Sequence, residues 1–116
     1  MPIIIAGPCV IEHPEIMDEI AETISRINQS KGTNIIFKAS FDKANRTSVS
    51  SYRGPGIDNG LTILSDIKSK YGLQITTDIH EAWQAHPVAE VADIIQIPAL
   101  LCRQTLFPVQ LKPERL

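Results

Sequence analysis

The chain has 116 residues, of which 43% are hydrophobic and 21% are charged, and its formal net charge is −2. This composition is typical of one globular domain, and the slight negative charge argues against a general binder of nucleic acid or other polyanions. No apolar run approaches the roughly 18 residues that a membrane span needs. No basic stretch precedes the apolar residues 3–5, so we expect no signal peptide and a cytoplasmic location.

Short apolar runs predict parallel strands, and amphipathic segments between them predict helices. The expected strands cover residues 3–6, 34–39, 73–77 and 93–97, and the expected helices cover residues 14–30, 59–71 and 81–90. The isoleucine-rich first run is typical of a strand buried on both faces. Pro14 suits a first helical turn, Gly32 and Gly72 suit helix ends, and Pro87 leaves the interior of the third helix open.

The alternation of strands and helices predicts a parallel α/β fold with right-handed crossovers. In such folds the carboxyl ends of the strands meet at one edge, and ligands bind there. We therefore expect the polar or small residues at these ends to form one site. They are Cys9, Lys38, Lys43, Asp78, His80, Gln96 and Ala99.

The segment after the second expected strand carries three cations, Lys38, Lys43 and Arg46, among hydrogen-bonding side chains. Lysine supplies a point charge and arginine a planar fork that can take two phosphate oxygens, so the segment favours a small phosphorylated ligand. A solvated basic loop is the alternative. The connection that follows, up to residue 57, is long for a compact domain, which favours a functional role.

Asp78 and His80 are candidates for proton transfer or for binding a substrate hydroxyl. For Glu81 the favoured interpretation is a helix N-cap. Gln96 is polar inside an apolar run and needs a partner if it is buried. Taken alone, Cys9 is interpreted as a small buried hydrophobic residue, and a role as a metal ligand would require further ligands nearby.

Several strings of residues together resemble the 3-deoxy-D-manno-octulosonate 8-phosphate synthases. The matching strings, in the family's order and spacing, are residues 5–9, 37–46, 51–56, 77–81 and 95–99. The resemblance covers residues 1 to about 105 and implies a TIM (β/α)8 barrel. The implied reaction condenses phosphoenolpyruvate with D-arabinose 5-phosphate, releases phosphate and serves lipopolysaccharide synthesis. Residues 43–46 separate the chain from the similar 3-deoxy-D-arabino-heptulosonate 7-phosphate synthases, which carry Lys-Pro-Arg-Thr there and use erythrose 4-phosphate. That activity is the second alternative.

The resemblance also implies roles for individual residues. Lys38 and Lys43 would hold phosphoenolpyruvate, with Gln96 and the Ala99 backbone beside it, and Asp78 and His80 would lie near the reacting groups. The remaining substrate-binding residues would be Ser40 and, for the pentose phosphate, Asn45, Arg46 and Thr47. In family tetramers Arg46 reaches a neighbouring subunit, so a homo-oligomer is expected. Cys9 would be a ligand of a divalent metal whose other ligands come from strands beyond residue 116.

Two departures from the family pattern modify this prediction. Thr47 stands where the family usually has serine, which keeps the hydroxyl. Residues 106–116 do not resemble the family's continuation and would fit a frameshifted reading frame. We therefore expect a partial barrel domain over residues 1–105, an atypical tail over residues 106–116, and self-association of the exposed sheet edges. An inactive remnant that binds sugar phosphates is the alternative function.

Overall fold

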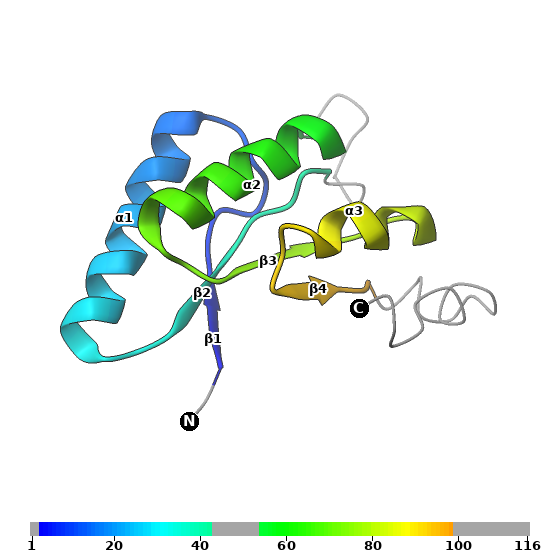
Figure 1. Ribbon diagram of the computed structural model, residues 1–116. Coiled ribbons are helices and arrows are strands. Elements are labelled where there is room, and N and C mark those ends of the chain that lie inside the picture. The colour runs from blue at the N-terminus through cyan, green and yellow to red at the C-terminus, as the bar shows by residue number, and fades with distance from the viewer. Residues whose placement is uncertain (1–2, 43–53, 99–116) are drawn as a thin grey trace.

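A computed structural model describes residues 3–42 and 54–98 of the chain. In these residues strands and helices alternate, and helices α1, α2 and α3 lie on one side of the sheet (Figure 1). The elements are β1 (Ile4–Ala6), α1 (Pro14–Lys31), β2 (Ile35–Lys38), α2 (Ile57–Tyr71), β3 (Ile75–Asp78), the 3₁₀ helix η1 (Ala82–Gln84), α3 (Ala85–Ala89) and β4 (Ile94–Gln96). No described helix is long and apolar enough to cross a membrane.

The four described strands form one sheet in the order β1-β2-β3-β4, and all neighbours are parallel. The predicted parallel α/β fold is therefore confirmed. The expectation that the first strand is buried on both faces is wrong, since Ile4 and Ile5 are 44% and 47% exposed. Within the described residues β1 has β2 as its single neighbour, so the strand lies at an edge of the sheet.

Glycine ends both long helices, as the sequence predicts. Gly32 and Gly72 have φ values of 66° and 65°, the left-handed conformation in which a side chain would be strained. Pro14 is the first residue of α1. Pro87 does not break α3 because it lies in the first turn, where no intrahelical N–H bond is lost.

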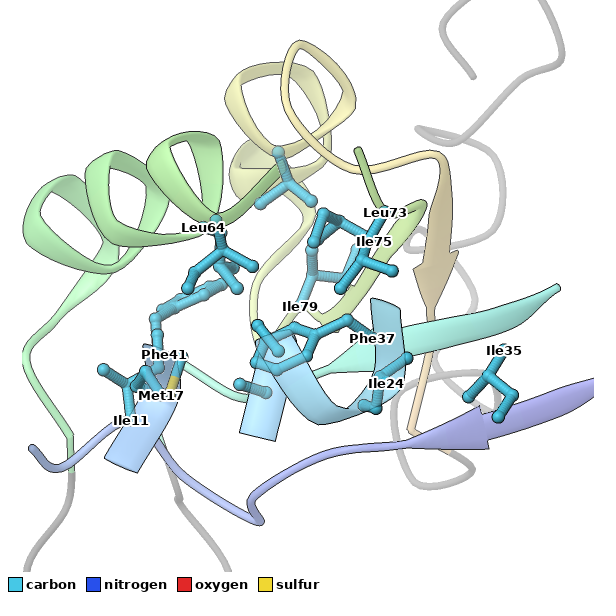
Figure 2. Packing of buried hydrophobic residues seen from close by; sticks show 14 of the residues in the cluster. Ile11, Met17, Ile24, Ile35, Phe37, Phe41, Leu64, Leu73, Ile75 and Ile79 are labelled. Carbon is cyan, nitrogen blue, oxygen red and sulfur yellow. The ribbon is translucent and has the colours of Figure 1, made fainter. Parts of the chain in front are cut away.

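The hydrophobic core lies between the helices and one face of the sheet (Figure 2). From β2 and the residues after it, Ile35, Phe37, Ala39 and Phe41 are buried in this core. Their spacing of two is the period of a strand, so the residues between them face the other side of the sheet. From the helices the largest contributions are the side chains of Met17, Ile24, Leu64 and Ile67.

Candidate functional site

The carboxyl ends of the described strands carry the predicted site residues. Lys38, Asp78 and Gln96 are the last residues of β2, β3 and β4, and Cys9 follows β1. The register pairs Asp78 with Gln96 and places Lys38 opposite Thr76, two residues before Asp78. Parallel pairing thus brings these four chain segments together at the carboxyl ends of the strands, as the sequence predicted.

Lys38 and Asp78 also share a face of the sheet. Their strand neighbours Phe37 and Ile79 are buried in the core under the helices, so alternation turns Lys38 and Asp78 to the opposite face. A cation and a carboxylate therefore flank the same open side of the carboxyl edge. This arrangement can bind an anion and hold a proton donor or acceptor beside it.

Asp78 and His80 approach each other without forming a hydrogen bond. The His80 Nε2 atom lies 3.6 Å from the Asp78 Oδ2 atom, and the two side chains are 15% and 21% exposed. Both Nε2 of His80 and Oδ1 of Asp78 are buried and have no hydrogen-bond partner among the described residues. Because an unpaired buried polar atom is costly, these two atoms are suited to the polar groups of a ligand.

Gln84 holds the backbone of His80, and our sequence reasoning missed this residue. Its Oε1 atom accepts hydrogen bonds from the His80 N–H at 2.7 Å and the Glu81 N–H at 3.2 Å. Glu81 is the N-cap residue of η1, which confirms the favoured interpretation. The signal was available, since an acidic or hydroxyl residue followed three positions later by Glu or Gln is typical of a helix start.

Ser40 and Cys9 lie where the ends of β1 and β2 meet. The Ser40 hydroxyl donates to the Asp42 carbonyl at 2.8 Å, and it also accepts from the Asp42 N–H at 3.3 Å. The Cys9 carbonyl accepts from the Ser40 N–H at 3.4 Å, and the Cys9 thiol is free and exposed. A hollow of about 230 Å³ opens beside Cys9, between the loop after β1 and the start of α1.

Gly7 permits the close approach of β1 to Lys38. A Cβ atom at this position would overlap the Lys38 carbonyl oxygen and lie 2.9 Å from the Lys38 nitrogen. Glycine is therefore required where the chain passes the backbone that presents the cation. Gln96 has an exposed side chain, while its carbonyl accepts from the Ile79 N–H at 3.1 Å.

The remaining predicted site residues lie outside the described part of the chain. They are Lys43, Asn45, Arg46, Thr47 and Ala99. In residues 3–42 and 54–98 no group of three or more His, Cys, Asp or Glu side chains could hold a metal ion. Cys9 could supply one thiolate ligand, but a metal centre would need further ligands from elsewhere.

Comparison with known proteins identifies the family. A sequence profile described as the DAHP synthetase I family matches residues 1–111, which is most of the chain. The chain belongs to the DAHP synthetase I family. As a portion of this family's TIM (β/α) barrel, the four parallel strands and their helices confirm the predicted fold class. The match to the DAHP synthetase I family continues past residue 105, where the sequence predicts a domain boundary.

Several curated relatives are named 2-dehydro-3-deoxyphosphooctonate aldolase. The protein from Fusobacterium nucleatum is 58% identical over 103 residues, which is 89% of this chain and 37% of the relative. One from Campylobacter jejuni is 55% identical over 103 residues, 89% of this chain and 38% of the relative. One from Helicobacter hepaticus is 52% identical over 115 residues, 98% of this chain and 43% of the relative. The chain thus spans about two fifths of the length of these relatives.

Proposed function

We propose that this chain carries part of the active site of a 3-deoxy-D-manno-octulosonate 8-phosphate synthase. The reaction would condense phosphoenolpyruvate with D-arabinose 5-phosphate, form one carbon–carbon bond, consume water and release phosphate. The observation that carries the proposal is the 58% identity to a protein named 2-dehydro-3-deoxyphosphooctonate aldolase, together with Lys38, Asp78 and Gln96 at one sheet edge. The same name on the other relatives supports it.

The chemistry of the site agrees with this reaction. Two phosphorylated anions repel each other, so their condensation requires fixed cations that offset the repulsion and hold the reacting carbons close. Lys38 would supply one such charge to phosphoenolpyruvate, and Lys43, Asn45, Arg46 and Thr47 would extend the cationic segment toward the pentose phosphate. These four roles, and those of Ser40, Gln96 and Ala99, remain predictions.

Asp78 and His80 would serve the polar groups of the bound substrates. The buried Oδ1 of Asp78 and Nε2 of His80 have no hydrogen-bond partner in the described part of the chain, and a hydroxyl or carbonyl of a substrate can provide one. Either residue could transfer a proton. Ligation of a divalent metal by Cys9 also remains a prediction, and the described residues alone do not form a metal centre.

The binding half of the proposal can be tested with the purified chain. Titration calorimetry should show binding of phosphoenolpyruvate, and Lys38→Met should weaken it about 10-fold to 100-fold, because a hydrogen bond to a charged group contributes about 1.5–3 kcal/mol. Lys31→Met is the matched control, since Lys31 is exposed at the C-terminal end of α1, just before the start of β2 and so away from the carboxyl ends of the strands. Equal weakening by both substitutions would reject a specific role for Lys38.

The catalytic half is tested by phosphate release. The assay mixes the chain with phosphoenolpyruvate, a divalent metal and either D-arabinose 5-phosphate or erythrose 4-phosphate. Phosphate release that occurs with D-arabinose 5-phosphate but not with erythrose 4-phosphate supports the proposed activity. Phosphate release that occurs only with erythrose 4-phosphate would replace it with the heptulosonate activity. Binding without release would support the sugar-phosphate-binding remnant. Turnover at the rate of a complete synthase would refute the alternative that the chain is an inactive remnant.

A further inference from the structure

Phe41 is held in one position by the residues around it. Its side chain is 1% exposed, and Figure 2 labels it in the core with Met17 and Leu64. Its carbonyl accepts a hydrogen bond from the Gly56 N–H at 3.0 Å. A Cβ atom on Gly60 would overlap the Phe41 Cβ atom. The ring therefore has little freedom to move, because backbone atoms surround its base.

The ring of Phe41 meets the imidazole of His80. The ring centroids are 5.6 Å apart and the planes are inclined by 74°, an edge-to-face contact. Gln84 holds the backbone of His80, and Asp78 lies 3.6 Å from its Nε2 atom. Among the described residues, the His80 ring is therefore contacted by the Phe41 ring and approached by the Asp78 carboxylate.

Phe41 also belongs to the segment that carries the predicted phosphate-binding cations. It follows Lys38 by three positions and comes directly before Asp42 and Lys43. Phe41 therefore connects the chain just after Lys38 with the Asp78–His80 pair at the end of the neighbouring strand β3. The sequence presents Phe41 as one apolar residue among many, and only the fold reveals this contact.

We propose that Phe41 is a positioning residue that orients the His80 imidazole toward Asp78 and links its orientation to anion binding at Lys38. The proposal rests on the proposed function for the identity of the anion, phosphoenolpyruvate. The predicted orientation of His80 in the free protein does not depend on the proposed function. The alternative is that Phe41 only fills the core.

Phe37 provides a matched control for this alternative. It lies four positions earlier, is also fully buried and belongs to the same core. No ring contact joins Phe37 to His80 within the described residues. Substituting leucine at either position removes an aromatic ring from the core, but only Phe41→Leu removes the contact with the imidazole.

The experiment uses the complete chain labelled with ¹⁵N and long-range ¹H–¹⁵N spectra of the histidine rings. The chain has three histidines, and His13 and His86 are exposed and serve as internal references. In the parent and in Phe37→Leu, the two ring nitrogens of His80 should show the separate shifts of one oriented tautomer. In Phe41→Leu these shifts should move toward the averaged values of the exposed references, with intact far-UV circular dichroism. If Phe41→Leu does not fold, Phe41→Met is measured in its place.

A second measurement separates this proposal from the proposed function. Saturation with phosphoenolpyruvate should displace the His80 signals in the parent and in Phe37→Leu, and the displacement should fall at least about twofold in the Phe41 variant. If phosphoenolpyruvate does not bind the parent, the proposed function fails, and the spectra of the free proteins still decide the orientation of His80. Equal averaging in both leucine variants, or in neither, would overturn the positioning role.

Discussion

Replacing Gly60 by alanine should destabilise the protein although the position lies inside a helix. In an exposed helix interior, alanine is favoured over glycine by about 1 kcal/mol. Here the new Cβ would overlap the Phe41 Cβ and lie 3.3 Å from the Phe41 Cα, so no rotamer change can relieve the contact. Overpacking of a core costs about 1–3 kcal/mol, and we expect the upper part of this range. The net loss should be about 2 kcal/mol of unfolding free energy.

Urea unfolding followed by far-UV circular dichroism measures this loss. With a slope of about 1.5–2 kcal/mol per molar urea, the midpoint should fall by about 1 M. Ser65→Ala is the control, because Ser65 is exposed on the same helix and the change should stay within about 0.5 kcal/mol. A Gly60→Ala protein as stable as the parent would refute the close packing of α2 on the chain after β2.

Two further predictions concern bonds that tie the sheet together. For Asp93, desolvation opposes ionisation, but the Ile75 N–H at 2.8 Å and the Lys68 ammonium at 3.1 Å outweigh it and lower the pKa of Asp93 below its ordinary value of 3.8. A carboxyl whose pKa is lowered on folding stabilises the fold at pH values above its unfolded pKa, so Asp93→Asn should cost about 1 kcal/mol of unfolding free energy at neutral pH. Unfolding measured at decreasing pH should show the stability difference between parent and variant shrinking below about pH 4. A stability difference that does not change with pH would contradict this. Thr77→Val removes the buried hydroxyl that donates to the Ala39 carbonyl at 2.8 Å and should cost about 1–2 kcal/mol in urea unfolding, whereas an unchanged midpoint would show that this bond contributes nothing.

Much of the fold could be predicted because its elements have strong local signals. The sequence of α1 has apolar residues at helical spacing, a proline in its first turn and Gly32 after its end, and the helix extends from Pro14 to Lys31. The continuous apolar runs located β2, β3 and β4 within two residues at each end. Parallel pairing then followed from the alternation of elements, and with it the edge at which Lys38, Asp78 and Gln96 meet.

The remaining features depend on tertiary contacts that leave little trace in a single sequence. The exposure of Ile4 and Ile5 follows from the place of β1 in the sheet, which an apolar run cannot reveal. The contact between Phe41 and His80 joins residues far apart in the chain, and its geometry depends on how two neighbouring strand ends are aligned. The buried atoms of Asp78 and His80 that lack a hydrogen-bond partner within residues 3–42 and 54–98 could likewise be recognised only once burial was known.

The missing side chain of Gly7 has a consequence for engineering this edge of the sheet. Any larger residue at position 7 would collide with the Lys38 backbone and push the carboxyl ends of β1 and β2 apart. The spacing between Cys9 and Lys38 would widen with it. A mutant library that aims to change ligand preference can randomise the residues beyond the strand tips, but it should keep position 7 constant.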